Sequence, residues 1–295
     1  MSEFVSVVIP TRNRCARLLE AIASVRMQTG VDLEIIVVDD ASMDGTSNAL
    51  HALCLEEPRL RYVRNEIPLG GGGARNAGGA LARGEFLAFL DDDDRFLAGK
   101  LVRQVAALRE RADASAASCS FLLHFGERQS ALQRLHAPRE RSELLRANML
   151  GGASVCMVRT ENFRKIGGFD PHLPSCQDWD LWLKLHAIGA IVVCEEPLVR
   201  YNFHPDGQIT GNTLAEYRGR RRVHLHYVGE MSPALRRNSL AALLYYRRVR
   251  FGTNVMHRLA GLFSVMRLAP GAGPALYLWR TFRLLQRGEL TRSFT

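Results

Sequence analysis

This sequence of 295 residues lacks the pattern of a signal peptide, a long apolar run and closely spaced cysteine pairs. Its first ten residues, MSEFVSVVIP, hold no basic stretch followed by a long apolar one, so we expect no signal peptide. No run of about 18 apolar residues occurs, so no membrane-spanning helix is predicted. The six cysteines are scattered without a CxxC pair, which argues against structural zinc and predicts reduced thiols in a cytoplasmic protein.

Acidic residues are scarce near the end of the chain. Residues 211–295 contain fifteen arginines and three acidic residues, a net charge of +12, so residues 1–210 carry −3 of the total of +9. This division predicts two domains, residues 1–210 and an arginine-rich helical extension at 211–295. The mixture of apolar and arginine residues suggests an anionic membrane surface as partner. The alternative is a helical subdomain that shows its arginines to water. No nucleic-acid-binding motif appears, so nucleic acid is not an expected partner.

The most unusual stretch present is Phe86–Arg95, FLAFLDDDDR. Its five apolar residues are too few for a helix and predict a buried strand. Four adjacent aspartates, Asp91–Asp94, follow at once, and their charges repel one another. A divalent cation, Mg²⁺ or Mn²⁺, would compensate this repulsion, because it prefers oxygen ligands and binds through one or two carboxylates plus substrate phosphates. The alternative is a solvated acidic turn at the start of the next helix.

Strands and helices alternate along the first hundred residues. Short segments rich in β-branched and other apolar residues predict strands at Val5–Ile9, Leu33–Val38, Leu60–Arg64 and Phe86–Leu90, and the glycines at 70–73 predict a loop leading into a helix. The alternation predicts an α/β fold with a mostly parallel sheet flanked by helices, which binds ligands beyond the carboxyl ends of its strands. No GxGxxG follows the first strand, which argues against a dehydrogenase. The polar residues expected at the strand ends are Pro10, Thr11, Arg12, Asn13, Asp39, Asp40, Arg75 and Asp91–Asp94.

Four motifs, in this order, resemble the nucleotide-sugar-binding half of family 2 glycosyltransferases: VSVVIPTRNR, EIIVVDDASMDGT, GGGARNAG and FLAFLDDDD. The resemblance implies the GT-A fold, a Rossmann-like fold of nucleotide-diphospho-sugar transferases. It implies a uracil and ribose site at Pro10, Thr11, Arg12 and Asn13, base contacts from Asp40 with Asp39 beside it, and further nucleotide contacts from Arg75, Asp91 and Asp92. Asp91-x-Asp93-Asp94 matches the family's DxD motif, so Asp93 is expected to bind the metal.

A second acidic motif, QDWDLWLKL at Gln177–Leu185, opens a predicted helix. On the residues alone, Asp178 would be an N-cap worth about 1 kcal/mol. The stretch also resembles the family's [ED]-D-x-D-L-W motif, which implies that Asp178 is the catalytic base. Trp179 and Trp182 either shape an acceptor site or pack the helix. The later Tyr201 and His204 are similar to a Tyr-Arg-x-His segment of the family, so His204 is a candidate contact for diphosphate or metal.

Together these residues predict an inverting, metal-dependent glycosyltransferase. Its donor would be a nucleotide-diphosphate sugar, a UDP-sugar first among them. Its acceptor would be a saccharide or lipid-linked hydroxyl, in the synthesis of cell-surface polysaccharide or glycoconjugate. Two alternatives remain, a nucleotidyltransferase and a nucleotide-sugar-binding protein without activity. We expect a cytoplasmic location, with peripheral attachment to the inner face of the membrane if the extension binds lipid.

Overall fold

The computed structural model describes residues 3–125, 129–203, 213–245 and 247. These residues belong to two compact units. The first contains residues 3–173 and 177–203, and the second contains residues 174–176 and the described residues from 213 onward. Each unit is considered by itself.

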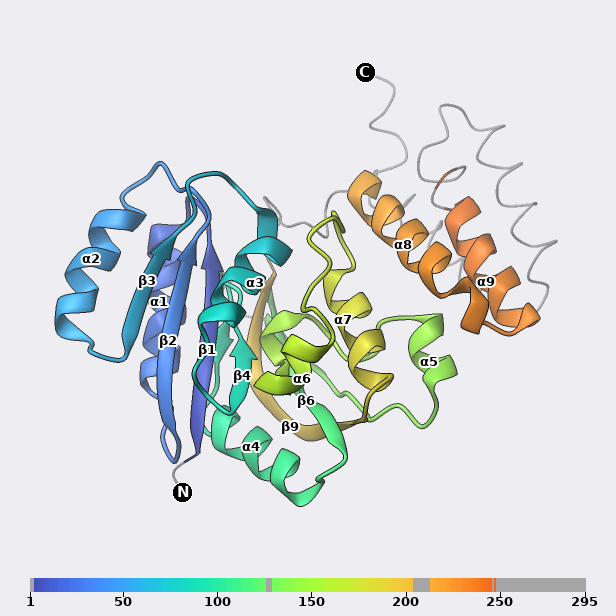
Figure 1. Ribbon diagram of the computed structural model, residues 1–295, viewed down its shortest axis with the longest axis horizontal. Coiled ribbons are helices and arrows are strands. Elements are labelled where there is room, and N and C mark those ends of the chain that lie inside the picture. The colour runs from blue at the N-terminus through green and yellow to red at the C-terminus, as the bar shows by residue number, and fades with distance from the viewer. Residues whose placement is uncertain (1–2, 126–128, 204–212, 246, 248–295) are drawn as a thin grey trace. The chain divides into compact units, whose positions relative to one another are not determined.

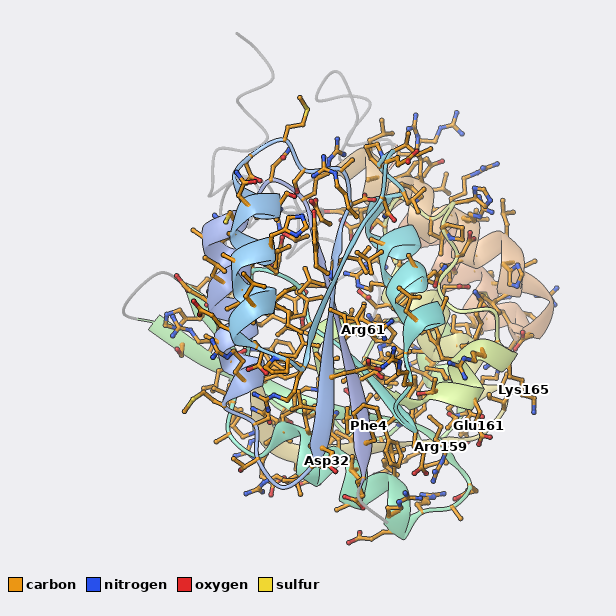
Figure 2. The ribbon with its side chains drawn as sticks, turned by 60° about the vertical axis from the view of Figure 1, so that its left-hand side comes forward. Phe4, Asp32, Arg61, Arg159, Glu161 and Lys165 are labelled. Carbon is orange, nitrogen blue, oxygen red and sulfur yellow. The ribbon has the colours of Figure 1, made fainter. Side chains whose placement is uncertain are left out.

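The N-terminal half of the first unit alternates strands with helices (Figure 1). Its elements are β1 (Phe4–Thr11), α1 (Cys15–Arg26), β2 (Asp32–Asp39), α2 (Thr46–Glu56), β3 (Leu60–Arg64), α3 (Gly70–Leu81) and β4 (Phe86–Phe89). The strands pair in the order β3-β2-β1-β4, and all three pairs are parallel, as predicted. Figure 2 shows Phe4 and Asp32 at the same end of β1 and β2, where the register pairs them.

The direction of the crossovers explains which face each helix covers. The chain moves from β1 through β2 to β3, and then returns past β1 to β4. Because parallel crossovers are right-handed, α1 and α2 must cover one face of the sheet and α3 the other. Figure 2 shows this arrangement, with α3 on the opposite side of β1 and β2 from α1 and α2. The order of the strands therefore reverses between β1 and β4, which is where such sheets bind ligands.

The second half of the unit makes the sheet mixed. It contributes β5 (Arg95–Phe96), α4 (Lys100–Glu110), β6 (Ala114–Phe125), β7 (Gln129–Gln133), α5 (Arg141–Arg146), the 3₁₀ turn η1 (Ala153–Val155), β8 (Met157–Arg159), α6 (Thr160–Lys165), α7 (Gln177–His186) and β9 (Ala190–Phe203). Strand β8 lies between β4 and β6 and is antiparallel to both, whereas β6 and β9 are parallel. The short β8 thus carries η1 beside the end of β4.

The four glycines at 70–73 form the first turn of α3, so the prediction of a loop there was wrong. Only Gly70 has a positive φ, at 72°. The absence of side chains serves packing within and beside the helix. A Cβ at Gly73 would lie 2.6 Å from the Leu69 Cβ, and one at Gly71 would lie 3.1 Å from Arg75 Nη1. Further along the same helix, a Cβ at Gly78 would lie 2.4 Å from Val8 Cγ1, so this helix can approach β1 closely only with glycine.

The second unit contains α8 (Thr213–Tyr227), the 3₁₀ turn η3 (Val228–Glu230) and α9 (Pro233–Leu244). Ser232 caps α9 by accepting a hydrogen bond from the Leu235 N–H, and His224 Nδ1 lies 2.7 Å from Ser239 Oγ, which joins the two helices. Two further predicted helices, within 253–267 and 272–286, lie outside the described residues. Among the helices that the structure does describe, none is both long enough and apolar enough to span a membrane.

Candidate active site at the ends of β1 and β4

The loops after β1 and β4 are tied together by side chains. Thr11 Oγ1 donates a hydrogen bond of 2.8 Å to Asp92 Oδ2. Arg14 Nη1 lies 3.0 Å from Asp92 Oδ1 and 3.3 Å from Asp93 Oδ2. Asp92 therefore has both oxygens occupied by its own chain, and its role in this structure is to hold the aspartate turn against the loop after β1.

The carboxyl group of Asp93 shares Arg14 with Asp92 and remains in an unfavourable, largely buried environment. Burial, followed by the charges of Asp91 and Asp92, raises the pKa of Asp93 to about 6, although Arg14 opposes the rise. Its side chain is only 12% exposed. A cation at this turn would relieve the repulsion among the three carboxylates.

Asp94, the last aspartate of the predicted metal motif, has a structural role in the turn. Its carboxylate accepts a hydrogen bond of 2.5 Å from Ser154 Oγ and one of 3.0 Å from the Asn202 N–H. Ser154 Oγ also accepts a hydrogen bond of 3.0 Å from the Asp91 N–H, and Asn202 Nδ2 donates to the Asp93 carbonyl. Residues from η1 and β9 therefore fix the turn from two sides. Ser154 and Asn202 were not predicted as site residues, because small and amide residues carry no distinctive signal.

A buried lysine and a glutamine support η1 from beneath. Lys100 Nζ donates a hydrogen bond of 2.6 Å to Gln104 Oε1, and Gln104 Nε2 donates one of 2.8 Å to the Val155 carbonyl. Burial lowers the pKa of Lys100 to about 8. Both side chains are fully buried. Their two hydrogen bonds satisfy the amide of Gln104 and the carbonyl of Val155 inside the core.

Arg75 links the aspartate turn to the start of α7. Its Nη2 forms an ion pair with Asp91 Oδ1, and its Nη1 donates a hydrogen bond of 3.2 Å to Gln177 Oε1. Its Nε is buried without a hydrogen-bond partner among the described residues. The guanidinium side chain is only 9% exposed. The guanidinium of Arg75 thus lies between two parts of the protein, and its contact with the nucleotide stays a prediction.

Asp178 lies in the first turn of α7, one residue after the helix begins. Burial raises the pKa of Asp178 to about 6, and the charge of Asp91 adds to this rise. The charge of Arg75 and hydrogen bonds from the backbone N–H groups of Asp178 and Ala153 lower the pKa and so oppose it. A Cβ built on Gly152 would lie 3.6 Å from Asp178 Oδ2 and 2.9 Å from the Tyr201 hydroxyl. Burial and the neighbouring carboxylates raise the pKa of Tyr201 well above its usual value, so its hydroxyl stays protonated beside the carboxylate.

The two aspartates at the end of β2 already have partners in the protein. Asp40 accepts hydrogen bonds from the N–H groups of Leu69 and Gly70 at the start of α3, at 2.7 and 2.8 Å. Asp39 accepts from Ser42 N–H at 2.8 Å and from Arg64 Nη1 at 3.0 Å. Their carboxylates therefore shape the loops around the expected base site, and any contact with a base would use the remaining lone pairs.

Other predicted residues fall into three groups. Pro10 is half-buried at the end of β1, while Arg12 and Asn13 are exposed at the rim. Asn13, with φ 53°, joins the loops after β1 and β2, because its N–H donates to Ser42 Oγ and its Oδ1 accepts from the Met43 N–H.

Trp179 and Trp182 are buried, and their indole N–H groups donate to the carbonyls of Leu144 and Gly151, which favours the packing alternative over an acceptor contact. His204 lies outside the described residues.

One comparison decides the family. The model of glycosyl transferase family 2 matches residues 6–166, more than half of the chain. The chain belongs to glycosyl transferase family 2. This membership confirms the resemblance and favours a glycosyltransferase over a nucleotidyltransferase.

Two relatives show how far the similarity extends within family 2. An uncharacterized glycosyltransferase of Haemophilus influenzae is 27% identical over 241 residues, which cover 78% of this chain and 79% of that protein. The GalNAc(5)-diNAcBac-PP-undecaprenol beta-1,3-glucosyltransferase of Campylobacter jejuni is 44% identical over 97 residues, which cover 32% of this chain and 31% of that protein. The stronger identity is thus confined to about a third of each chain.

Two solved structures share the fold. S. aureus TarS 1-349 in complex with UDP-GlcNAc has a TM-score of 0.66 at 19% identity and covers 91% of this chain and 82% of its own. The mannosyltransferase PcManGT from Pyrobaculum calidifontis, in complex with GDP-Man and Mn²⁺, has a TM-score of 0.63 at 20% identity and covers 98% and 83%. These likenesses confirm the predicted GT-A fold of this family 2 chain.

The residues at the aspartate turn fit a divalent cation only in part. Within the described residues, no group of three or more His, Cys, Asp or Glu side chains is arranged to hold a metal ion alone. A Mg²⁺ site that includes substrate needs fewer protein ligands, because one or two carboxylates combine with the phosphates of the substrate. Asp93, with its raised pKa, and the half-buried Asp91 are the side chains that would supply such oxygens.

Proposed function

We propose that this chain is an inverting glycosyltransferase that moves a sugar from a nucleotide-diphosphate donor, most simply a UDP-sugar, to an acceptor hydroxyl. One observation carries the proposal: a single buried guanidinium, Arg75, pairs with Asp91 and bonds to Gln177, the residue before Asp178. The donor side and the proposed base are therefore held at a fixed spacing by one side chain. A scaffold that only bound nucleotide would not require Asp178.

The donor would lie across the ends of β1, β2 and β4. Its base and ribose would meet Pro10–Asn13 and the loops that Asp39 and Asp40 shape, and its diphosphate would lie beside Asp91–Asp93. Support comes from the reversal of strand order between β1 and β4, the position at which sheets of this kind bind ligands beyond the strand ends. The two solved neighbours were determined in complex with UDP-GlcNAc and with GDP-Man, which are ligands of this chemical class.

A divalent cation bound through Asp93 and Asp91 would supply positive charge to the leaving diphosphate. The protein contributes the geometry of that site. Ser154 and Asn202 hold the backbone of the turn, and Arg14 neutralises Asp92 so that Asp93 keeps an oxygen for the ion. Because water is largely excluded from these side chains, their electrostatic effect on a developing charge is stronger than in bulk solvent.

Asp178 would take the proton from the acceptor hydroxyl. Its pKa of about 6 lies close to neutral pH, so the carboxylate is ionised at pH 7 to 8 and remains basic enough to accept a proton. Arg75 keeps the pKa from rising further, and the Ala153 N–H orients the carboxylate. Attack from the side of α7 on a sugar held at the strand ends would invert the anomeric centre.

The acceptor is proposed to be a saccharide or lipid-linked hydroxyl, as in polysaccharide or glycoconjugate synthesis. The Campylobacter relative is named for an undecaprenol-linked glycan, which supports a lipid-linked acceptor here. We further propose that residues 1–210 form the catalytic domain and residues 211–295 a separate extension.

Thermal melts with nucleoside diphosphates test this function directly. UDP, GDP or dTDP should raise the melting temperature only when Mn²⁺ or Mg²⁺ is present, because a ligand that binds the folded state alone stabilises it. The Asp93→Ala variant should lose the metal-dependent part of that shift and the turnover of nucleotide sugar. Asp32→Ala, at the opposite end of β2 (Figure 2), is the matched control and should behave as the parent. If no nucleotide changes the melting temperature, the proposed donor site is wrong. Full turnover in excess EDTA would refute the proposed requirement for a metal ion.

A further inference from the structure

The 3₁₀ turn η1 contacts both sides of the proposed active site. Ser154 Oγ donates a hydrogen bond of 2.5 Å to the Asp94 carboxylate and accepts one of 3.0 Å from the Asp91 N–H. The N–H of the preceding residue, Ala153, donates to the carboxylate of Asp178. All three residues of η1 are buried. The spacing between the aspartate turn and Asp178 therefore depends on where η1 is held.

The orientation of one amide holds η1 from α4. Gln104 Nε2 donates a hydrogen bond of 2.8 Å to the Val155 carbonyl of η1, and only the NH₂ side of the amide can do this. On the other side of the amide, Lys100 Nζ lies 2.6 Å from Gln104 Oε1. An ammonium group has three donors and no acceptor, so it requires the amide oxygen on its own side. Lys100 thereby turns the NH₂ of Gln104 toward η1.

The surroundings of Lys100 contain no compensating charge. Its side chain is fully buried, its Nζ lies 4.1 Å from the centre of the Phe96 ring, and no carboxylate among the described residues pairs with it. The titratable groups that face it are the thiols of Cys119 in β6, Cys156 before β8 and Cys194 in β9. Burial raises the pKa of all three thiols, so they are neutral at pH 7 to 8. An ammonium buried without a counter-charge is unfavourable, so stability gives no reason for a lysine here.

We propose that Lys100 is a positioning residue of the transfer reaction. By fixing the amide of Gln104 it holds η1, and η1 sets the spacing between the aspartate turn and Asp178. Lys100 touches no substrate and acts only through Gln104 and η1. This inference rests on the proposed function, because it takes Asp178 as the base and the aspartate turn as the metal site. Loss of the Lys100 proton weakens the restraint, because a neutral amine can also accept a hydrogen bond and so permits the other orientation of the amide.

The Lys100→Met variant keeps the length of the side chain and removes its donors. With Mg²⁺ and UDP-GlcNAc or GDP-mannose, its turnover should be roughly 10- to 100-fold lower, the cost of a small displacement of reacting groups. Its melting temperature at pH 7 should be equal to that of the parent or higher, because an uncompensated buried charge is gone. A lysine that served only the fold would give the opposite result, a lower melting temperature with turnover preserved in the folded fraction.

The pH profile gives a second readout. Burial lowers the pKa of Lys100 to about 8, so the parent's turnover should fall above about pH 8, whereas the Lys100→Met variant should show no such fall. Because Lys100 acts through Gln104, the double variant Lys100→Met with Gln104→Met should be no slower than Gln104→Met alone. Lys165→Met makes the same change at an exposed lysine at the end of α6 (Figure 2) and should behave as the parent.

Three results would overturn the proposal: turnover of Lys100→Met within twofold of the parent, fully additive losses in the double variant, or an alkaline fall shared by parent and variant. The parent's own profile decides if the variant does not fold, because a parent without a fall above pH 8 also refutes the role. Failure of the proposed function is seen separately. A parent whose melting temperature does not respond to UDP with Mg²⁺ has no donor site, whereas a responsive parent beside a fully active Lys100→Met variant refutes only the role of Lys100.

Discussion

Replacing Asp178 by Asn separates its proposed catalytic role from a structural one. If Asp178 is the base, Asn keeps the size of the side chain and an oxygen for the Ala153 N–H but cannot accept the proton. Turnover should fall by a factor of about 10²–10⁴, the usual contribution of a positioned base. Binding of nucleoside diphosphate should be unchanged, because the donor residues are untouched.

The same substitution should make the folded protein more stable at neutral pH. The ionised carboxylate is unfavourable in its buried position, because its pKa is raised from 3.8 to about 6. A rise of that size corresponds to roughly 3 kcal/mol at most, and partial solvent access reduces it to about 1–3 kcal/mol. The sign follows from proton binding: the folded state holds a proton that the unfolded chain has lost between about pH 4 and 6. The increase in unfolding free energy from Asp178→Asn should therefore be complete above pH 6 and decrease as the pH drops toward 4.

Three measurements on the parent and the Asp178→Asn variant are sufficient. Turnover is followed as nucleoside diphosphate released from UDP-GlcNAc and GDP-mannose with Mn²⁺. Melting temperatures are recorded at pH 5 and pH 8, with and without UDP. Turnover within a few-fold of the parent would remove Asp178 from the mechanism. An Asn variant that is less stable than the parent at pH 8 would refute the burial argument, whatever happens to activity.

Three further substitutions test the surroundings of this residue. Arg75→Gln removes a positive charge that lowers the pKa of Asp178, so the acidic limb of the pH–turnover profile should move above pH 6. An unchanged acidic limb would contradict this. Ser154→Ala should cost about 2–4 kcal/mol of unfolding free energy, because a buried carboxylate and an N–H both lose a partner, and should weaken Mn²⁺ binding in titrations. Gly152→Ala should slow transfer by crowding the Tyr201 hydroxyl, and Tyr201→Phe should relieve that effect; simple additivity would argue against crowding.

The parallel half of the fold could be predicted from the sequence because its strands are buried on both faces. Runs such as Val5–Ile9 and Leu33–Val38 are apolar except for Ser6 and Glu34, which bond to each other, and the observed strands contain them. The antiparallel half gave weaker signals. Strand β8 has three residues, and its pairing with β4 depends on contacts between segments about 70 positions apart, which no local pattern reveals.

The site was predictable where chemistry is carried by charge. Asp93 stands out because it belongs to a run of four carboxylates at a strand end. Asp178 stands out only because its stretch resembles a family motif, since a carboxylate at a helix start is otherwise an ordinary N-cap. The roles of both residues remain predictions. The partners of those carboxylates were not predictable. Ser154 and Asn202 are ordinary residues, and only the fold brings them to Asp94. The glycines of α3 were misassigned because a glycine run favours a loop locally, whereas close packing beside Leu69 and Val8 selects it in a helix.

The hydrogen bonds to Asp94 set the order in which this enzyme can become functional as it is made. One joins positions 60 residues apart and another joins positions 108 residues apart. Such long-range contacts form late, because the entropy of closing the chain must be overcome first. The aspartate turn emerges from the ribosome long before β9 does. A nascent chain that ends before Asn202 would carry the DxD sequence with its turn unsupported, so metal binding during synthesis would report completion of the sheet.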